Sequence, residues 1–447
     1  MKIYNTLTRR KEEFISIKDK IVGLYTCGPT VYDFAHIGNL RAYLFEDVLR
    51  RVLEFDGYKV SHVQNITDVG HLTSDSDTGE DKLEVGAKRE GKTAWEVAEF
   101  YTKAFKEDMG KLNILMPTIW PKVTDHIKEQ IELIKKLEKK GFTYKISDGI
   151  YFDTTKLKDY GKLAKLDIKG LRAGARVEMG DKKSPTDFAL WKFSPKDSKR
   201  QMEWDSPWGK GFPGWHIECS AMSMKYLGET FDMHAGGVDH IGVHHINEIA
   251  QSEAATGKKF VNYWVHNEHL LVDNQKMSKS LHNFYTLNDL IKKGFDPLAF
   301  RYLCLESHYR SKMNFTLNAL EGAQNTLNAI RQLKFRRNNT HSTSKSTISL
   351  YSDIVKSFNN DLDTPKALAL LHQVNDFSLW MKFESILGLG LSSNIYRLTY
   401  GQEHLIEQRE EARKNKDFDK ADKIRKELEK QGIKIEDTNS GQRILTQ

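Results

Sequence analysis

The first 70 residues follow a strand–loop–helix–strand pattern that narrows the possible folds more than any other feature of the chain. The apolar run "IVGLYT" (21–26) leads into Gly28-Pro29, and residues 39–54 carry apolar side chains at helical spacing. The run "YKVSHVQNIT" (58–67) then alternates apolar and polar residues, as a strand does. Two strands joined by a helix are typical of a parallel α/β sheet. A right-handed crossover places the loop after the first strand at the carboxyl edge of the sheet, where such sheets bind ligands.

The pattern changes twice farther along the chain. Thr93 and Glu96 predict a capping box that opens a helix of the α/β part. Residues 142–210 hold short β runs such as "DFALWKF" and indicate a segment inserted into the α/β domain. From about Pro297 onward the spacing is helical, which is typical of a helix bundle, and one helix is expected near 407–430.

The composition is that of an ordinary globular protein and argues against several other classes. Of the 447 residues, 39% are hydrophobic and 29% charged. No run of 18 apolar residues occurs, so no membrane span is expected, and the N-terminus lacks the apolar core of a secretory signal. Three cysteines cannot build a disulfide framework, and their odd number favours a reducing, cytoplasmic location. The net charge of +7 is a mild indication of a polyanionic partner.

The motif "HIGN" (36–39) has features that a phosphate site requires. It follows the first predicted strand and opens a helix, whose N-terminus carries partial positive charge. Gly38 allows close approach of the backbone, and His36 can donate a hydrogen bond to a phosphate oxygen. Taken alone, the motif favours a histidine that only caps the helix or is solvated.

A second motif, "KMSKS" (276–280), strengthens the phosphate interpretation. Lys276 and Lys279 stand among small polar residues after a predicted strand, and two ammonium groups on a loop suit a triphosphate. A solvated basic turn would explain this motif if it stood alone. Together the two motifs resemble the signatures of class I aminoacyl-tRNA synthetases, which implies a Rossmann-like domain that activates an amino acid with ATP. The first signature usually ends in His, whereas this chain has Asn39.

Two later stretches are rich in potential metal ligands. The first, "GFPGWHIECSAM" (211–222), contains Cys219. The second, "GGVDHIGVHHINEIAQSE" (236–253), places His244 and Glu248 at i and i+4, on one face of a helix. Added to Cys27, they form a possible Cys₂-His-Glu set, which suits Zn²⁺. The alternative is that both cysteines are small buried residues and that His244 and Glu248 pair on a helix surface. Three further histidines compete for the ligand role: His234, His240 and His245.

Five stretches, in order along the whole chain, resemble the cysteinyl-tRNA synthetase family. They are "CGPTVYD…HIGN", "NITD", "GWHIECSAM", "GGVDH…HHINEIAQSE" and "KMSKSLHNF". The resemblance implies an α/β fold with a Rossmann-like parallel-sheet catalytic domain, an inserted segment and a C-terminal helical bundle domain. It implies one Zn²⁺ per chain, held by Cys27, Cys219, His244 and Glu248, with an open position that takes the substrate thiol as thiolate. It also implies Mg²⁺ bound with ATP.

The same resemblance implies the reaction and its partners. L-cysteine reacts with ATP to give cysteinyl-adenylate and pyrophosphate, and the cysteine then passes to the terminal adenosine of tRNA(Cys). A monomer is expected. The ATP-binding residues would be His36, Gly38, Asn39, Gly236, Gly237, Asp239, Lys276 and Lys279. The amino-acid site would include Gly28, Thr67 and Trp215. The tRNA-binding candidates in the C-terminal tail are Arg413, Asp422 and Asp437.

Several of these roles have plainer alternatives. Thr67 is also suited to a strand-end cap, Trp215 to a core aromatic, and the tail to a solvated helix face. The family more often has Glu at the position of Ile246, which leaves open any role for a carboxylate there. We expect five regions: 1–115, first half of the catalytic domain; 116–210, inserted connective segment; 211–270, second half; 271–320, stem-contact region with the KMSKS loop; 321–447, helical tRNA- and anticodon-binding domain.

Two rival functions remain at this point. A ligase that joins cysteine to an amino-sugar acceptor would use the same zinc and adenylate chemistry but would not need a tRNA-reading tail. A nucleic-acid-binding protein with structural zinc would have no use for "HIGN" paired with "KMSKS".

Overall fold

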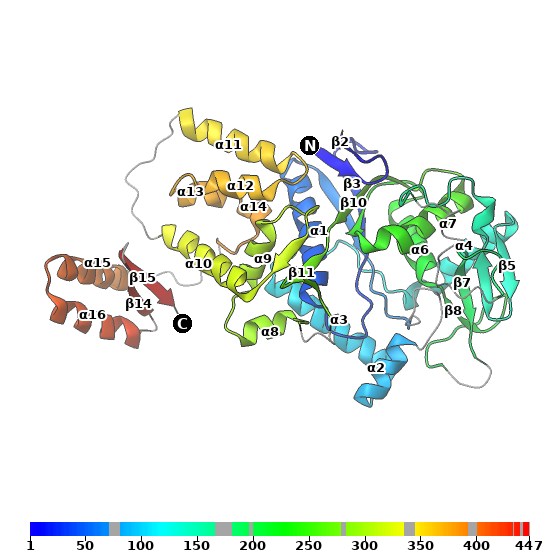
Figure 1. Ribbon diagram of the computed structural model, residues 1–447, viewed down its shortest axis with the longest axis horizontal. Helices are drawn as coiled ribbons and strands as arrows, with labels where there is room; N and C mark the ends of the chain where they lie inside the picture. Colours follow the sequence, from blue (N-terminus) through cyan, green and yellow to red (C-terminus); the bar gives the residue numbers. More distant parts are fainter. Residues whose placement is uncertain are drawn as a thin grey trace.

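The centre of the molecule is a four-stranded parallel sheet (Figure 1). In this computed structural model the described residues are 1–70, 81–165, 181–195, 200–278, 283–334, 345–391, 400–431, 433–438 and 441–446. The sheet has the order β10-β9-β3-β4, with β3 Ile21–Thr26, β4 Lys59–Gln64, β9 Phe231–Gly237 and β10 Val261–Asn267. Because β3 pairs with β4 on one side and β9 on the other, the strand order reverses between β3 and β9.

Helices cover both faces of this sheet. The crossover from β3 to β4 contains α1 (Ile37–Phe55), and the crossover from β9 to β10 contains α7 (Ile246–Thr256), which packs beside α6 (Trp215–Leu227). Figure 1 shows α1 on one side of the sheet and α6 and α7 on the other. The buried side chains form a separate apolar core on each face. The expected Rossmann-like fold class is therefore confirmed.

The local predictions for the α/β part are also confirmed. The run "IVGLYT" forms β3, and α1 includes the helix expected at 39–54. Thr93 caps α3 (Ala94–Lys111) by accepting from Glu96 N, while the Glu96 carboxylate accepts from Thr93 N at 2.8 Å. This is the reciprocal capping box expected from the two residues.

The residues between α3 and α6 form a second, antiparallel sheet. Helix α4 (Ile127–Lys139) leads into it. Its order is β5-β6-β7-β8, with β5 Thr143–Ile146, β6 Gly149–Phe152, β7 Phe188–Phe193 and β8 Gly211–Pro213. Figure 1 shows this sheet at one end of the molecule, on the far side of α6 and α7. Strand β8 leads directly into α6, so the second sheet returns the chain to the parallel sheet.

Helices dominate the chain after β10. A small sheet of β11 (Leu270–Val272), β12 (Gln275–Lys276) and β13 (Met313–Phe315) precedes and interrupts them. The helices are α8 Leu287–Lys292, α9 Pro297–Leu305, α10 Leu317–Leu333, α11 Lys345–Phe358, α12 Thr364–Leu371, α13 Phe377–Lys382 and α14 Glu384–Leu387. The remaining elements of the first part are β1 Lys2–Asn5, β2 Arg10–Glu13 and α2 Lys82–Glu90. Within the described ranges, no helix is both long and apolar enough to cross a membrane.

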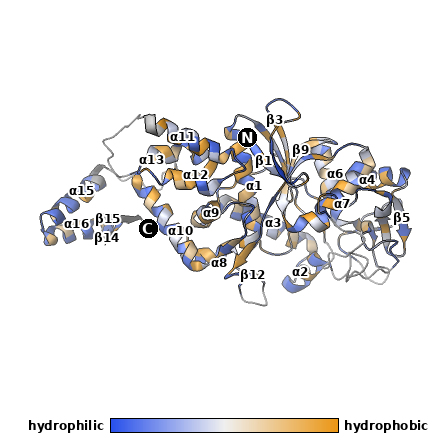
Figure 2. Cartoon of the chain, turned by 45° about the horizontal axis from the view of Figure 1, so that its top comes forward, coloured by the Kyte–Doolittle hydropathy of each residue, from blue (hydrophilic) through white to orange (hydrophobic). Residues whose placement is uncertain are grey.

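The single helix expected near 407–430 is wrong. The chain instead forms α15 (Tyr400–Lys414) and α16 (Phe418–Lys430), followed by a hairpin of β14 (Ile433–Thr438) and β15 (Gly441–Thr446). Lys416 has φ of 61°, which ends the first helix, and the Asp417 side chain accepts from Lys420 N to start the second. Figure 2 shows that hydrophilic residues dominate this pair of helices, and their small apolar core includes Ile424 and Leu428.

A buried carboxylate joins α1 to the helical part of the chain. Asp47, on α1, lies 2.7 Å from Arg51 Nε and 2.6 Å from an Nη of Arg301 on α9. The Asp47 and Arg301 side chains are fully buried. Arg301 also donates to the carbonyl of Leu387 at the end of α14. The Asp47–Arg301 pair therefore links the parallel sheet's first helix to two helices from the later part of the chain.

We predict that Asp47→Ala lowers the free energy of unfolding by about 3–5 kcal/mol, because it leaves two buried guanidinium groups without their carboxylate. Glu54→Ala is the matched control on the same helix, since it removes a partly exposed pair with Arg50 and should cost less than about 1 kcal/mol. Urea unfolding followed by circular dichroism measures both. Equal losses in the two variants would contradict the role assigned to Asp47.

Candidate active site

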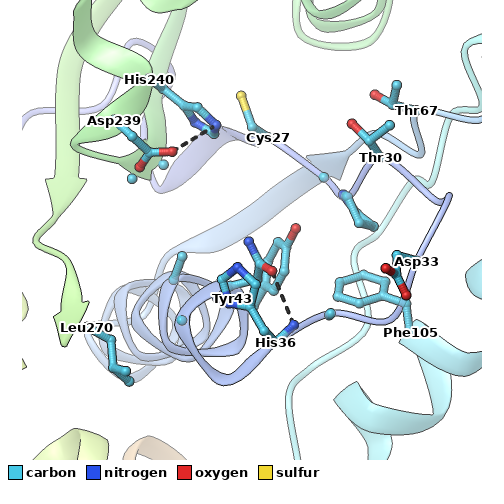
Figure 3. A pocket seen from close by; sticks show the side chains of 18 of the residues that line it. Cys27, Thr30, Asp33, His36, Tyr43, Thr67, Phe105, Asp239, His240 and Leu270 are labelled. Carbon is cyan, nitrogen blue, oxygen red and sulfur yellow. Dashed lines mark hydrogen bonds and ion pairs between the residues drawn. The ribbon is translucent and has the colours of Figure 1, made fainter. Parts of the chain in front are cut away.

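A cleft of about 930 Å³ opens where the carboxyl ends of β3 and β9 meet (Figure 3). This is the point at which the strand order reverses, the usual ligand position in open parallel sheets. Most of the residues singled out from the sequence line it. They are Cys27, Gly28, His36, Gly38, Asn39, Thr67, Trp215, Cys219, Gly236, Gly237, Asp239, His244 and Lys276. Lys279 lies outside the described residues.

The "HIGN" motif forms the N-terminus of α1 at the cleft wall. His36 is the N-cap, and its Nδ1 accepts from Asn39 N at 3.2 Å. The Asn39 side-chain oxygen accepts in return from His36 N at 3.2 Å. His36 therefore does cap the helix, as the alternative interpretation of the motif expected, and Asn39 completes this cap. Because both residues line the cleft, capping holds them where the helix dipole faces the cavity.

Four buried side chains gather at the other side of the cleft. Ligand atoms of Cys27, Cys219, His244 and Glu248 all lie within 4.8 Å of one another. Cys27 follows β3, and Cys219 lies on α6. His244 lies in a π-helical turn (Ile241–His245) that continues into α7, where Glu248 lies with its Oε1 3.0 Å from His244 Nε2. A π-helical turn at such a position is common at functional sites.

A second group overlaps this one and contains Cys27, His234, His245 and Glu248. Access separates the two groups, because Cys27, Cys219 and His244 line the cleft, whereas His234 and His245 are absent from its lining. His234 Nε2 donates instead to Glu248 Oε2 at 3.0 Å, and His245 Nδ1 lies 2.7 Å from His266 Nε2. These two histidines therefore contact the group on the side that faces away from the cleft.

The electrostatics of the group suit a cation. The pKa of Cys219 is lowered to about 6 by its hydrogen bond with Cys27, against the effect of burial. Burial opposes charge on His244, yet Glu248 and Cys219 raise its pKa to about 10. Burial also opposes charge on Glu248, but His234 and His244 lower its pKa to about 2. Two thiols, an imidazole and a carboxylate, all buried, are a donor set that Zn²⁺ accepts.

Trp215, Thr67 and Gly28 surround the same end of the cleft. The Trp215 ring lies 4.4 Å from the His244 ring, centroid to centroid, so it stands beside the group of possible metal ligands and not in a distant part of the core. Thr67 accepts from Asn65 Nδ2 at 2.9 Å and lies 3.5 Å from Glu218. Gly28 N donates to Asn65 Oδ1 at 2.8 Å. These contacts join the loop after β3 to the loop after β4.

Residues after β9 and β11 complete the cleft. Gly236 and Gly237 end β9, and the Asp239 carboxylate lies 3.8 Å from His240 Nε2, the pair drawn in Figure 3. Lys276 is exposed at the end of the β11–β12 hairpin. The glycines leave backbone room, while the lysine brings a cation to the side of the cleft where α1 begins.

Sequence reasoning missed one buried acid of the cleft, Glu46. It accepts from Gln64 Nε2 at 3.2 Å, and burial raises the pKa of its carboxyl well above the usual range. Asn39, Tyr43 and Glu46 all line the cleft and recur at helical spacing, so projection of α1 as a helix would have revealed the acid.

The three tail candidates lie far from the cleft. Arg413 is on α15, Asp422 on α16 and Asp437 on β14. Asp437 accepts from Arg413 at 2.7 Å and from the buried Arg409 at 2.8 Å. These ion pairs tie the hairpin to the helix, and Asp422 takes no part in them. Figure 1 shows the whole unit at the end of the molecule opposite the β5–β8 sheet.

Comparison with known proteins places these features in context. A family model described as the catalytic domain of class I (C) tRNA synthetases matches residues 13–325. A second, described as the anticodon binding domain of cysteinyl-tRNA ligase, matches residues 397–444. The chain is 52% identical to a cysteine–tRNA ligase 1 of Burkholderia lata, over 99% of this chain and 96% of that protein. It is 45% identical to a cysteine–tRNA ligase of Treponema denticola, over 98% of each.

A solved structure shares the fold at much lower sequence identity. The methionyl-tRNA synthetase of Mycobacterium tuberculosis, in complex with methionyl-adenylate, superposes with a TM-score of 0.58 at 14% identity. The match covers 82% of this chain and 84% of that one. At this identity the likeness concerns the fold alone.

Gly28→Ala should disrupt the cleft, because an added Cβ would lie 1.5 Å from the Asn65 carbonyl oxygen. We expect a loss of about 1–3 kcal/mol in the free energy of unfolding. We also expect weaker uptake of Co²⁺, read from its thiolate absorption, since the neighbouring Cys27 shifts with the loop. Gly110→Ala on α3 is the control, because its Cβ would meet no described atom within 4 Å. Normal Co²⁺ uptake by Gly28→Ala would show that the close approach is unimportant.

Proposed function

The chain belongs to the cysteine–tRNA ligase family of class I aminoacyl-tRNA synthetases, and we propose that its cleft joins L-cysteine to tRNA(Cys) at the expense of ATP. The observation that carries the proposal is the meeting, in one cleft, of a buried Cys₂-His-Glu group with the capped start of α1. The first suits a thiol-bearing substrate and the second suits phosphates. The match of residues 397–444 to an anticodon-binding family supports tRNA as the acceptor.

The reaction has two steps. A carboxylate oxygen of cysteine attacks the α-phosphorus of ATP, a new P–O bond forms, and the bond to pyrophosphate breaks. A ribose hydroxyl of the terminal tRNA adenosine then attacks the carbonyl carbon. An ester forms, AMP departs, and the hydroxyl proton passes to its phosphate. Neither step needs a nucleophile from the protein, so this chain contributes positioning and charge stabilisation.

We assign the phosphates of ATP, bound with Mg²⁺, to the side of the cleft where α1 begins. His36, Gly38, Asn39 and Lys276 line that side, and Lys279 is proposed to join them from the sequence motif. The N-terminus of α1 and the lysines oppose the negative charge that grows on the departing pyrophosphate. Gly236, Gly237 and Asp239, at the end of β9, are proposed to hold the adenosine, with Asp239 accepting from its ribose hydroxyls.

We propose that Cys27, Cys219, His244 and Glu248 hold one Zn²⁺. Their burial, their mutual distances within 4.8 Å and the support of Glu248 by His234 favour this assignment. When bound, the zinc supplies a soft Lewis acid that prefers a sulfur ligand to the hydroxyl of serine. Gly28, Thr67 and Trp215 are proposed to enclose the rest of the cysteine, because they surround this group.

The remaining assignments concern the whole molecule. We propose the five regions given by residues 1–115, 116–210, 211–270, 271–320 and 321–447, supported by the separate β5–β8 sheet and by the helices after β13. Arg413, Asp422 and Asp437 are proposed to face the anticodon. A cytoplasmic monomer is proposed as well, since one chain supplies every residue assigned to the cleft and Cys27 and Cys219 are free thiols.

The proposed activity predicts ATP–pyrophosphate exchange that depends on cysteine, followed by charging of tRNA(Cys). Exchange is measured with labelled pyrophosphate and charging with labelled cysteine. Exchange without charging would favour a ligase for an amino-sugar acceptor. If no exchange occurs, both functions are contradicted.

The zinc assignment predicts that Cys27→Ser lowers the zinc content well below one ion per chain and weakens the preference for cysteine over serine at least about tenfold. Zinc is measured by elemental mass spectrometry and preference by exchange with each amino acid. Cys304→Ser is the control, because Cys304 is on α9 and outside the cleft lining. Unchanged zinc in Cys27→Ser would remove Cys27 from the ligand set.

A further inference from the structure

One buried acid of the cleft has no role in the reaction as described so far. In the described part of the chain, the carboxylates that line the cleft are Asp33, Glu46, Asp239 and Glu268. Asp33 lies 3.7 Å from Arg89, and Asp239, with a side chain 63% exposed, lies 3.8 Å from His240. Glu268 is half-buried. Glu46 differs from all three, because only 2% of it is exposed.

Neutral side chains hold Glu46 in place. Gln64 Nε2 donates to Glu46 Oε2 at 3.2 Å and to Thr26 Oγ1 at 2.9 Å, so both hydrogens of the amide are used. Thr26 is the last residue of β3 and Gln64 the last of β4. The acid on α1 is therefore tied to two strands at the edge of the sheet where the cleft opens.

This network gives Glu46 no positive charge. Burial raises the pKa of the Glu46 carboxyl well above its usual range, and a hydrogen bond with Thr26 offsets the effect only in part. No lysine, arginine or histidine of the described ranges pairs with it. A buried carboxylate is strongly disfavoured as an anion unless a cation accompanies it. Since Glu46 lines a cleft and a carboxylate has lone pairs beyond those that two donors use, a ligand can supply that cation.

The acid lies close to the residues assigned to the cysteine substrate. Asn39, Tyr43 and Glu46 line the cleft from one face of α1. In the view of Figure 3, Tyr43 lies between His36 and Cys27. Burial first, and then the negative charge of Glu46, raise the pKa of Tyr43. Burial and neighbouring acids, Glu46 among them, likewise raise the pKa of Cys27, so Glu46 is near both side chains.

We propose that the Glu46 carboxylate binds the α-ammonium group of the cysteine substrate. The inference deepens the proposed function and rests on it. There, the substrate thiol is assigned to the group around Cys27, and the substrate carboxylate meets ATP where α1 begins. The amino and carboxylate groups share one carbon atom, and the thiol is attached through the next. The ammonium therefore faces the wall between these two places, where Glu46 is the buried acid.

This assignment divides the recognition of cysteine between two groups. The proposed zinc selects a thiol, whereas Glu46 selects a thiol that carries an α-amino group. An ion pair that is also hydrogen-bonded is strong in a cleft of low dielectric constant. A thiol without the amino group would leave Glu46 without its cation, and the cleft would bind it less tightly than cysteine.

The test replaces Glu46 by Gln, which keeps the shape of the side chain and an oxygen for Gln64 but removes the charge. KM for cysteine in ATP–pyrophosphate exchange should rise about tenfold or more, and KM for ATP should stay unchanged. Glu54→Gln is the matched control, because it removes a carboxylate from the same helix outside the cleft lining, and neither KM should change. Glu46→Asp keeps a carboxylate and should recover part of the loss.

The second readout is β-mercaptopropionate, which has the thiol and the carboxylate of cysteine but no amino group. Its inhibition constant against cysteine is measured for the wild-type protein and for Glu46→Gln, and it should not rise in the variant. A general distortion of the cleft would weaken both compounds. Loss of the partner of the ammonium weakens cysteine alone.

An unchanged KM for cysteine in Glu46→Gln would overturn the proposal, and so would an equal weakening of cysteine and β-mercaptopropionate. If circular dichroism shows that Glu46→Gln does not fold, Glu46→Met, with an uncharged side chain of similar length, is judged by the same two measurements. If the wild-type protein shows no exchange that depends on cysteine, the proposed function itself fails instead.

Discussion

The parallel pairing of β3 with β9 is the contact on which the rest of the molecule depends. Leu24 pairs with Met233, Tyr25 with His234 and Thr26 with Ala235, although the two strands are far apart in the sequence. The pairing brings the ends of both strands to one edge, so Cys27 and Gly236 open into the same cleft. The helices that follow β3 and β9 cover opposite faces of the sheet, which leaves this edge uncovered. Without that single register the Cys₂-His-Glu group and the capped N-terminus of α1 would have no common cavity.

Helix α1 connects this cleft to the later, helical part of the chain. Its first turn is capped by His36 and Asn39 at the cleft, and its middle is held by the buried Asp47–Arg301 pair. Between them, Arg41 donates to the carbonyls of Glu268 at 2.5 Å and Ser311 at 2.6 Å. Glu268 lines the cleft, so the same helix that presents the capped N-terminus also anchors the segment facing it. One helix therefore makes contacts with both the helical region and the cleft.

The sequence alone predicted those features whose cause is local. The strand at 21–26, the helix after it and the Thr93–Glu96 box follow from side-chain spacing and capping, which act over a few residues. The break at Lys416 was missed because the apolar spacing continues across it, although Asp417 was available as a cap. The Cys₂-His-Glu group could not be derived from spacing, since only the β3–β9 pairing brings Cys27 to His244. Phe34 and Phe100 meet only because α3 folds back on the loop after β3.

Every residue of one continuous segment, 27–36, lines the cleft. It starts among the possible metal ligands with Cys27, passes Phe34 and ends at the helix cap with His36. The loop after β4 holds this segment in place, because Thr67 N donates to Pro29 O at 3.0 Å and Val31 N donates to Thr67 O at 3.2 Å. The missing side chain of Gly28 lets these two loops approach, because a Cβ there would lie 1.5 Å from the Asn65 carbonyl oxygen, so the shape of the cleft beside Cys27 depends on this backbone contact.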